Sequence, residues 1–92
     1  MAVYVDSEDI LWRGKLWCHL AADTLDELHS FASRLGLRKS WFQSKGYPHY
    51  DVTVSMRERA LIMGAIDADR ETIVGCCKQL KMELRQQVLG LA

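Results

Sequence analysis

An amphipathic helix predicted over residues 24–36, directly after an apolar strand, limits what this chain can fold into. Thr24 and Glu27 have the spacing of a capping box, in which each side chain satisfies a free backbone N–H of the other residue. Apolar residues then recur at helical spacing as far as Gly36, a typical helix end. These residues are Leu25, Leu28, Phe31, Ala32 and Leu35. The strand before it, residues 15–22, has no plainly polar face, so we expect it to be central and covered on both sides.

The remaining elements are predicted from the same kinds of signal. Strands are expected at residues 2–5 and 49–54, with a further candidate at 40–43, and residues 7–14 are expected to form a loop. A capping-box pattern at Ser55 and Glu58 predicts a short helix ending near Gly64, and Asp67 or Asp69 is expected to cap a long last helix. The prediction is an α+β fold of order β-β-α-β-α-α, with the helices packed on one side of a small sheet.

Size and charge narrow the possible functions. Ninety-two residues are enough for one modest core, so residues 1–92 are predicted to form a single domain. Twelve basic and twelve acidic side chains cancel, which argues against polymeric nucleic acid as a partner. The sequence contains no apolar run near the roughly 20 residues of a spanning helix, and its start is not that of a signal peptide. We therefore expect a cytoplasmic protein with no membrane partner.

The last helix carries a narrow apolar seam with a four-three-four rhythm. Its members are Ile73, Cys77, Leu80, Leu84 and Val88. The seam is predicted either to pack on the sheet or to form a homodimer through residues 70–88.

Residues 38–51 are the predicted ligand-binding segment, because they combine rings, cations and polar groups where a turn needs none. Aromatic faces stack on bases, and Arg or Lys neutralises phosphate. The first hypothesis is therefore a binding domain for a small phosphate-bearing ligand, such as a nucleotide derivative. The candidate binding residues are Arg38, Trp41, Gln43, Lys45, His49, Tyr50 and Asp51.

A second hypothesis is a metal-dependent hydrolase, of phosphoesterase or nuclease type. His19, His29, His49 and Asp51 are the candidate ligands, and two or three imidazoles with a carboxylate suit zinc or a harder divalent ion. The spacing matches no HExxH or HxH pattern. Simpler roles are also open: His29 as a half-buried helix flank, and His49 bonded to Asp51 across the turn. A divalent metal is expected only under this hypothesis, and the sequence leaves any other cofactor unknown.

Four motifs occur in this order along the chain: VYVD, WCHLAADTLDELHSFASRLGL, WFQ and HYDVT. In these motifs and their order the chain resembles the domain of unknown function 4031 family of bacteria and bacteriophages. The resemblance covers residues 2–75. Relative to the family, the Gln43–His49 turn is longer than in many members and the last helix extends further. The matching positions are Asp6, His19, Asp23, Glu27, His29, Trp41, Phe42, Gln43, His49, Tyr50 and Asp51. The family implies no activity, so a third hypothesis stays open: a bacteriophage-encoded interaction or inhibitor module. Whether the protein is an enzyme is not decided by its sequence.

Overall fold

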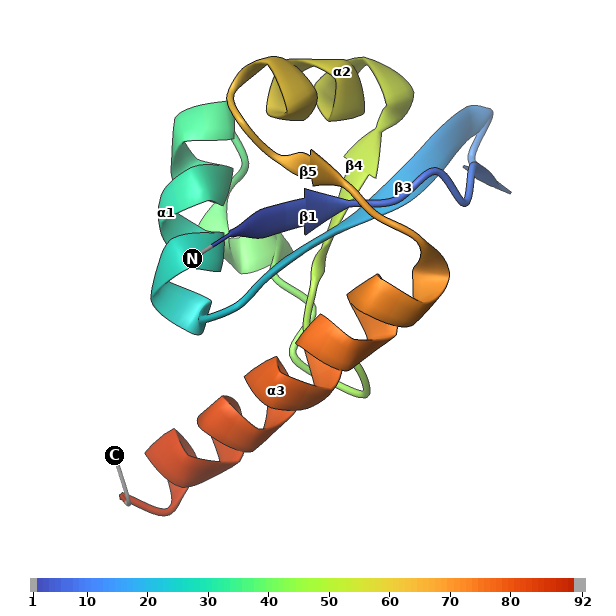
Figure 1. Ribbon diagram of the computed structural model, residues 1–92. Coiled ribbons are helices and arrows are strands. Elements are labelled where there is room, and N and C mark those ends of the chain that lie inside the picture. Colours follow the sequence, from blue (N-terminus) through green and yellow to red (C-terminus); the bar gives the residue numbers. More distant parts are fainter. Residues whose placement is uncertain (1, 91–92) are drawn as a thin grey trace.

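The computed structural model describes residues 2–90, which form an α+β fold with a mixed five-stranded sheet and three α-helices (Figure 1). In chain order the elements are β1 (Val3–Val5), β2 (Ile10–Trp12), β3 (Lys15–Ala22), α1 (Leu25–Leu35), the 3₁₀ turn η1 (Lys39–Trp41), β4 (Tyr50–Thr53), α2 (Val54–Ile62), β5 (Ile66–Asp67) and α3 (Arg70–Val88). The predicted class and the broad order of strands and helices are confirmed.

Strand β3 is the centre of the sheet. Antiparallel β4 pairs with its middle through Trp17↔Thr53 to Leu20↔Tyr50. On the other edge, β1 pairs with the end of β3 and β2 with its start, both antiparallel, and β5 runs parallel to β1. The segment between β1 and β2 therefore passes beside the middle of β3, where Asp6 N–H donates to the His19 carbonyl at 3.1 Å.

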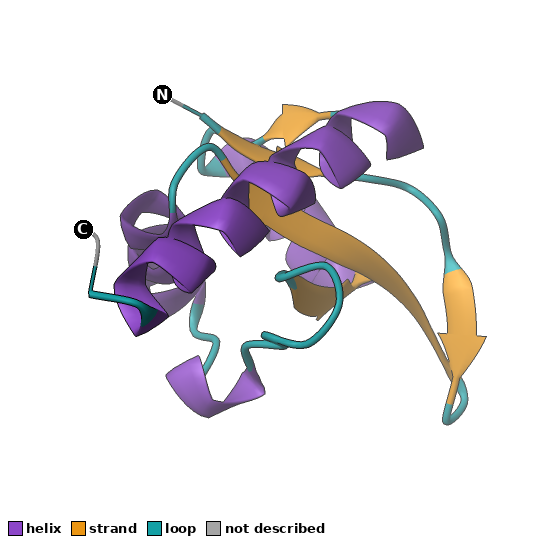
Figure 2. Cartoon of the chain, turned by 90° about the horizontal axis from the view of Figure 1, so that it is seen from below, coloured by secondary structure: helices purple, strands orange, loops and turns teal. Residues whose placement is uncertain are grey.

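Different helices cover the two faces of the sheet. His19 of β3 lines a cleft together with Ile73 of α3. Leu20, the next residue, pairs with Tyr50, whose hydroxyl lies 2.8 Å from His29 Nδ1 of α1. Because adjacent strand residues face opposite sides, α1 and α3 lie on opposite faces. Figure 1 likewise shows α2 and α3 on opposite sides of β1 and β3, and Figure 2 shows α3 crossing in front of the sheet.

The prediction that all helices pack on one side is therefore wrong for α3. The reason lies in β3, which is apolar on both faces and so needs cover on both. The first part of the predicted α3 seam supplies it, since Ile73, Cys77 and Leu80 are buried. Farther along, Val88 is 83% exposed. Homodimerisation through residues 70–88 stays a prediction, with only the later part of the seam free to serve it.

Three local predictions are corrected. Residues 10–12, expected in a loop, are the strand β2 of a hairpin, closed by Arg13 and Gly14 with φ of 50° and 76°. A two-residue turn with both φ values positive matches the twist of the strands. Residues 40–43 do not form a strand: part of this segment is η1, followed by a single bridge between Gln43 and His49.

The third correction concerns the helix starts. Thr53, not Ser55, caps α2 by accepting the Met56 N–H. At α1, Thr24 accepts the Glu27 N–H at 3.2 Å as predicted, but the Glu27 carboxylate accepts from the Thr24 hydroxyl rather than from its main-chain N–H. Asp69 caps α3, as expected. Asp23, the residue before the α1 cap, accepts the Ala2 N–H at 2.8 Å. Within residues 2–90, no helix combines the length and apolar character required to cross a bilayer.

Candidate metal centre

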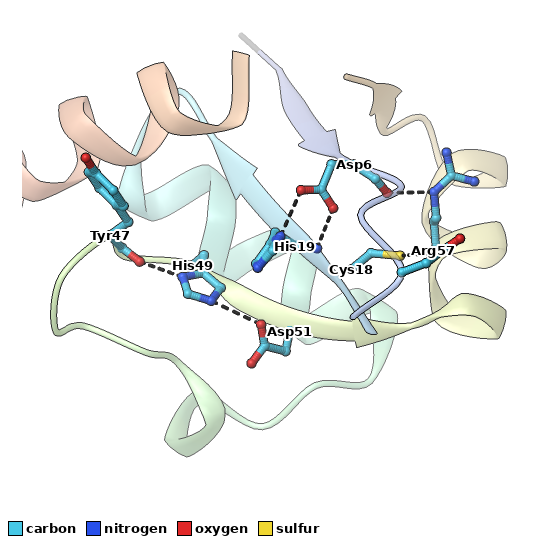
Figure 3. Close-up of polar contacts among 8 residues, drawn as sticks. Asp6, Cys18, His19, Tyr47, His49, Asp51 and Arg57 are labelled. Carbon is cyan, nitrogen blue, oxygen red and sulfur yellow. Dashed lines mark hydrogen bonds and ion pairs between the residues drawn. The ribbon is translucent and has the colours of Figure 1, made fainter. Parts of the chain in front are cut away.

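The register of β3 and β4 brings three predicted metal ligands together on the face that α3 covers only in part. His19 pairs directly with Asp51, and His49 stands two residues before Asp51 on the same face. One ligand atom from each of these three side chains lies within 4.8 Å of the other two, and all three side chains are half-buried (Figure 3). The His19 and His49 rings meet edge to face, with centroids 5.1 Å apart. The site is thus assembled from segments thirty residues apart in sequence.

Asp6 fixes the His19 ring. Its carboxylate accepts the His19 main-chain N–H at 2.8 Å through Oδ1, and its Oδ2 lies 2.8 Å from His19 Nδ1. Asp6 itself is only 2% exposed, and its carbonyl accepts Arg57 Nε–H at 2.7 Å. A carboxylate accepts but does not donate, so the ring proton belongs on Nδ1. His19 Nε2 then carries a free lone pair that can bind a metal ion.

His49 has an acceptor at each ring nitrogen. Nδ1 lies against the Tyr47 carbonyl oxygen at 2.5 Å, and Nε2 lies 3.0 Å from Asp51 Oδ1. A neutral imidazole has only one N–H, so it cannot donate to both. The arrangement is satisfied when the ring is a cation, or when Nδ1 carries the proton and a metal ion stands between Nε2 and the carboxylate. Gln43 Nε2–H donates to the second oxygen of Asp51.

The pKa shifts follow from these contacts. The hydrogen bond to Asp6 raises the pKa of His19, although burial acts in the opposite direction. Burial alone raises the pKa of Asp6, but the side-chain and backbone hydrogen bonds from His19 outweigh it and hold that pKa below its usual value. The contact with His49 lowers the pKa of Asp51. The site therefore keeps both carboxylates ionised at neutral pH.

Two clefts open onto this cluster. One, of about 300 Å³, lies between the sheet and α3 and is lined by His19, His49, Glu8 and Arg70 among others. The other, of about 470 Å³, lies beside the β2–β3 hairpin and shares His19 and His49 with the first. The polar cluster is therefore open to a small molecule from two sides.

A comparison with known proteins identifies the family of the chain. The sequence model of a family described as protein of unknown function (DUF4031) matches residues 3–80. The chain belongs to the DUF4031 family. Comparison with curated proteins and with solved structures gives no match. Membership in the DUF4031 family confirms the resemblance found in the sequence, and the family's description states no activity.

The structure of this DUF4031 protein divides the predicted site residues into three groups. Gln43, His49 and Asp51 line the cleft beside the hairpin, together with His19. His29 and Tyr50 lie on the opposite face of the sheet, where Tyr50 is buried and their side chains contact each other. Burial lowers the pKa of His29 and raises that of Tyr50. His29 therefore does not join the other metal candidates, and Tyr50 does not face a ligand in either cleft.

The exposed cations and ring of the predicted segment lie apart from the cluster. Arg38 stacks over the Trp41 ring at 5.8 Å, and both residues are exposed beside η1. Lys45 is exposed in the turn. Neither cleft is lined by Arg38, Trp41 or Lys45. Residues 38–51, predicted to form one binding site, are thus separated in space, and only some of them line a cleft.

Three residues of this DUF4031 site were not singled out for it by sequence reasoning. For Asp6 the sequence does contain an indication, because this residue follows the first strand in the VYVD motif, and polar site residues often stand at strand ends. Glu8 and Arg70 had none, since both stand in ordinary polar segments. Glu8 follows β1 and Arg70 follows β5 in the chain. Both residues line the cleft because β1 and β5 are neighbouring parallel strands, so the segments after these strands lie side by side.

Proposed function

We propose that this protein is a metal-dependent hydrolase in which His19, His49 and Asp51 hold a divalent ion of the zinc class. The observation that carries the proposal is that ligand atoms of all three side chains lie within 4.8 Å of one another beside two clefts. Two imidazoles and one carboxylate are a ligand set of catalytic zinc sites, in which a fourth position is left for water. Closed structural sites use four protein ligands, so three ligands favour catalysis.

The contacts behind the ligands support the same conclusion. Metal-binding histidines generally donate their second N–H to a carboxylate or a backbone carbonyl, which sets the tautomer and the ring direction. His19 has Asp6 in this role and His49 has the Tyr47 carbonyl. Both rings then offer Nε2 to the ion. When Nδ1 carries the proton of the neutral His49 ring, Nε2 and Asp51 Oδ1 are both acceptors, and a cation between them would be bound by both.

The chemistry that such an ion would supply is activation of water, because zinc lowers the pKa of a bound water to about 7. Glu8 is the candidate general base, because it lines the same cleft and its carboxylate makes no hydrogen bond or ion pair with residues 2–90. The water gives one proton to Glu8, and its oxygen bonds to the electrophilic centre of the substrate. The leaving oxygen then takes that proton as its bond breaks, which balances the hydrolysis.

The other two hypotheses stay predictions. Phosphate binding by Arg38 and Lys45 is supported less well than the metal site, because these cations stand away from both clefts. A role as an interaction or inhibitor module is supported by no specific contact within the described residues.

The proposal is tested by adding zinc to chelator-treated protein in a calorimeter and assaying the same sample on phosphate and carboxylic esters. We expect one zinc per chain, and hydrolysis that depends on it. His49→Ala should lose both, and Glu8→Gln should bind zinc normally but turn over at least about 100-fold more slowly. His29→Ala, folded by circular dichroism, is the matched histidine control and should still bind zinc.

Two results contradict the proposal. One is the absence of zinc binding, or zinc binding that is unchanged in His49→Ala. The other is a preference for Fe²⁺ with oxygen consumption and no hydrolysis, because two histidines and one carboxylate also form the ligand set of non-haem iron oxygenases.

A further inference from the structure

The hairpin β2–β3 carries a pair of indole rings beside the proposed metal centre. The second cleft, of about 470 Å³, has the metal cluster and Gln43 on one side and Ile10, Trp12 and Trp17 on the other. Ile10 pairs with Trp17 across the hairpin, and Trp17 stands two residues before His19 on β3. These side chains therefore lie on the same face of the sheet as the cluster. Figure 2 shows the hairpin extending away from the helices, so this part of the face stays open.

Trp12 is exposed and Trp17 is half-buried, and both rings are held in place. Trp12 is 56% and Ile10 48% exposed, and the Arg13 guanidinium carbon stands 4.7 Å from the centroid of the Trp12 ring. Burial of the remaining exposed apolar surface by a ligand is favourable. The Trp17 indole N–H donates to the Trp12 carbonyl at 3.0 Å, and the two rings meet edge to face at 6.0 Å. The turn that carries them is a tight two-residue turn at Arg13–Gly14. A fixed pair of rings is a surface suited to another flat ring, because little conformational entropy is lost on stacking.

The first cleft indicates the other half of the ligand. Arg70 lines it, and its guanidinium makes no ion pair with the described residues. A guanidinium beside a divalent ion is suited to a phosphate group, which can accept from the fork while one oxygen meets the metal. His19 and His49 belong to both clefts, so the phosphate end and the ring end of one molecule can lie on either side of them.

We infer that the substrate is a small phosphate ester that carries a flat aromatic group, either a nucleobase or an aryl ring. The scissile group lies at the metal, with Arg70 on its phosphate, and the ring lies against Trp12 and Trp17. This inference rests on the proposed metal-dependent hydrolase and names its substrate class. A net charge of zero favours a small ligand over a nucleic acid polymer, which needs many phosphate contacts.

The experiment uses tryptophan fluorescence in a Trp41→Phe background. The chain has three tryptophans, and Trp41 stands at η1 away from the clefts, so this variant leaves Trp12 and Trp17 as the reporters. Zinc-loaded protein that also carries Glu8→Gln, so that the esters are turned over only slowly, is titrated with adenosine monophosphate against ribose 5-phosphate, and with phenyl phosphate against methyl phosphate. Ring-bearing ligands should quench the signal and bind about 5- to 150-fold more tightly than their ringless partners, the range expected for one stacked base. The two pairs separate a nucleobase from a simple aryl ring.

Two variants assign the contacts. Trp12→Ala should remove the preference for rings and leave ringless phosphates unchanged, and Trp12→Phe should restore part of it. Arg70→Gln should weaken ring-bearing and ringless phosphates alike, by roughly tenfold or more. Because Trp12 is exposed near the end of the hairpin, its removal leaves the core intact, and circular dichroism checks this.

The outcomes separate the inference from the proposed function. If zinc binds one to one but ring-bearing and ringless phosphates bind equally, the substrate inference is wrong and the metal centre stands. If ring preference persists in Trp12→Ala, the assignment of the ring to the hairpin is wrong. A protein that binds no zinc in the calorimeter overturns the proposed function and this inference together.

Discussion

Replacing Asp6 by asparagine keeps the shape of the side chain and removes the charge that fixes the His19 ring. In the native protein one carboxylate oxygen accepts the His19 main-chain N–H at 2.8 Å, and the other lies 2.8 Å from Nδ1. In the variant, the amide oxygen can keep the main-chain bond, so the NH₂ group faces Nδ1. Two donors cannot bond to each other, and the ring therefore moves its proton to Nε2. The hydrogen then stands on the atom that is proposed to bind the metal.

The size of the effect follows from this tautomer change. Loss of a partner that orients a metal-binding histidine typically costs 10- to 100-fold in metal affinity. This corresponds to about 1.4 to 2.8 kcal/mol of binding free energy. We expect the loss of zinc affinity in Asp6→Asn to fall in this range, because His49 and Asp51 keep their positions and still offer two ligands. The fold should survive, since asparagine has nearly the volume of the aspartate that it replaces.

Calorimetric titration with zinc at pH 7.5 measures this loss, and circular dichroism confirms that the variant is folded. Asp26→Asn is the matched control, because it makes the same chemical change at an exposed position of α1 and should leave zinc affinity unchanged. A folded Asp6→Asn protein that binds zinc within twofold of the native affinity would refute the role given to Asp6.

Three further predictions concern pH, thiol chemistry and the opposite face. The raised pKa of His19 stabilises the fold fully below its ordinary value of 6.5, and this stabilisation is lost as pH rises through the raised pKa. The lowered pKa of Asp6 stabilises the fold above its ordinary value of 3.8, and this stabilisation is lost as pH falls through the lowered pKa. Urea unfolding of the metal-free protein should therefore show the largest contribution of this pair between about pH 3.8 and 6.5, and the contribution should be absent in Asp6→Asn. Burial raises the pKa of Cys77 to about 11, so iodoacetamide at pH 8 should label it, by mass spectrometry, only after unfolding; labelling of the native protein would contradict its burial. Tyr50→Phe removes the contact to His29 and should lower the unfolding free energy by about 1 to 3 kcal/mol with no change in zinc affinity, whereas a change in zinc affinity would place His29 in the site.

Local sequence signals predicted the helices well. The Thr24 cap, the apolar spacing of α1 and the Gly36 end are all determined within a dozen residues, and each appears in the structure. The hairpin β2–β3 was missed because its turn is Arg13–Gly14, and arginine rarely adopts a positive φ. An Asn-Gly pair at the same position would have indicated the hairpin directly. The side of the sheet on which α3 lies depends on long-range packing, which a single apolar seam does not specify.

The candidate site was only partly accessible from the sequence. Alternation along a strand over residues 49–54 puts His49 and Asp51 on one face, but the pairing of His19 with Asp51 depends on the register between β3 and β4. The same register explains why Tyr50, the neighbour of both His49 and Asp51 in the chain, faces the core instead. Arg38 and Lys45 are close to His49 in sequence, yet η1 and the turn carry them away from the clefts. Proximity in sequence was a poor guide at this point because the segment reverses direction.

The most direct test of the metal centre is a crystal structure of the protein grown with zinc and measured at the zinc absorption edge. We expect one strong anomalous peak at about 2.0 to 2.2 Å from His19 Nε2, His49 Nε2 and an Asp51 carboxylate oxygen, with a water or buffer ligand completing the tetrahedron. His19 Nδ1 should still face Asp6. A peak at other residues, or an empty map at this cluster in crystals that contain zinc, would contradict the proposed metal centre.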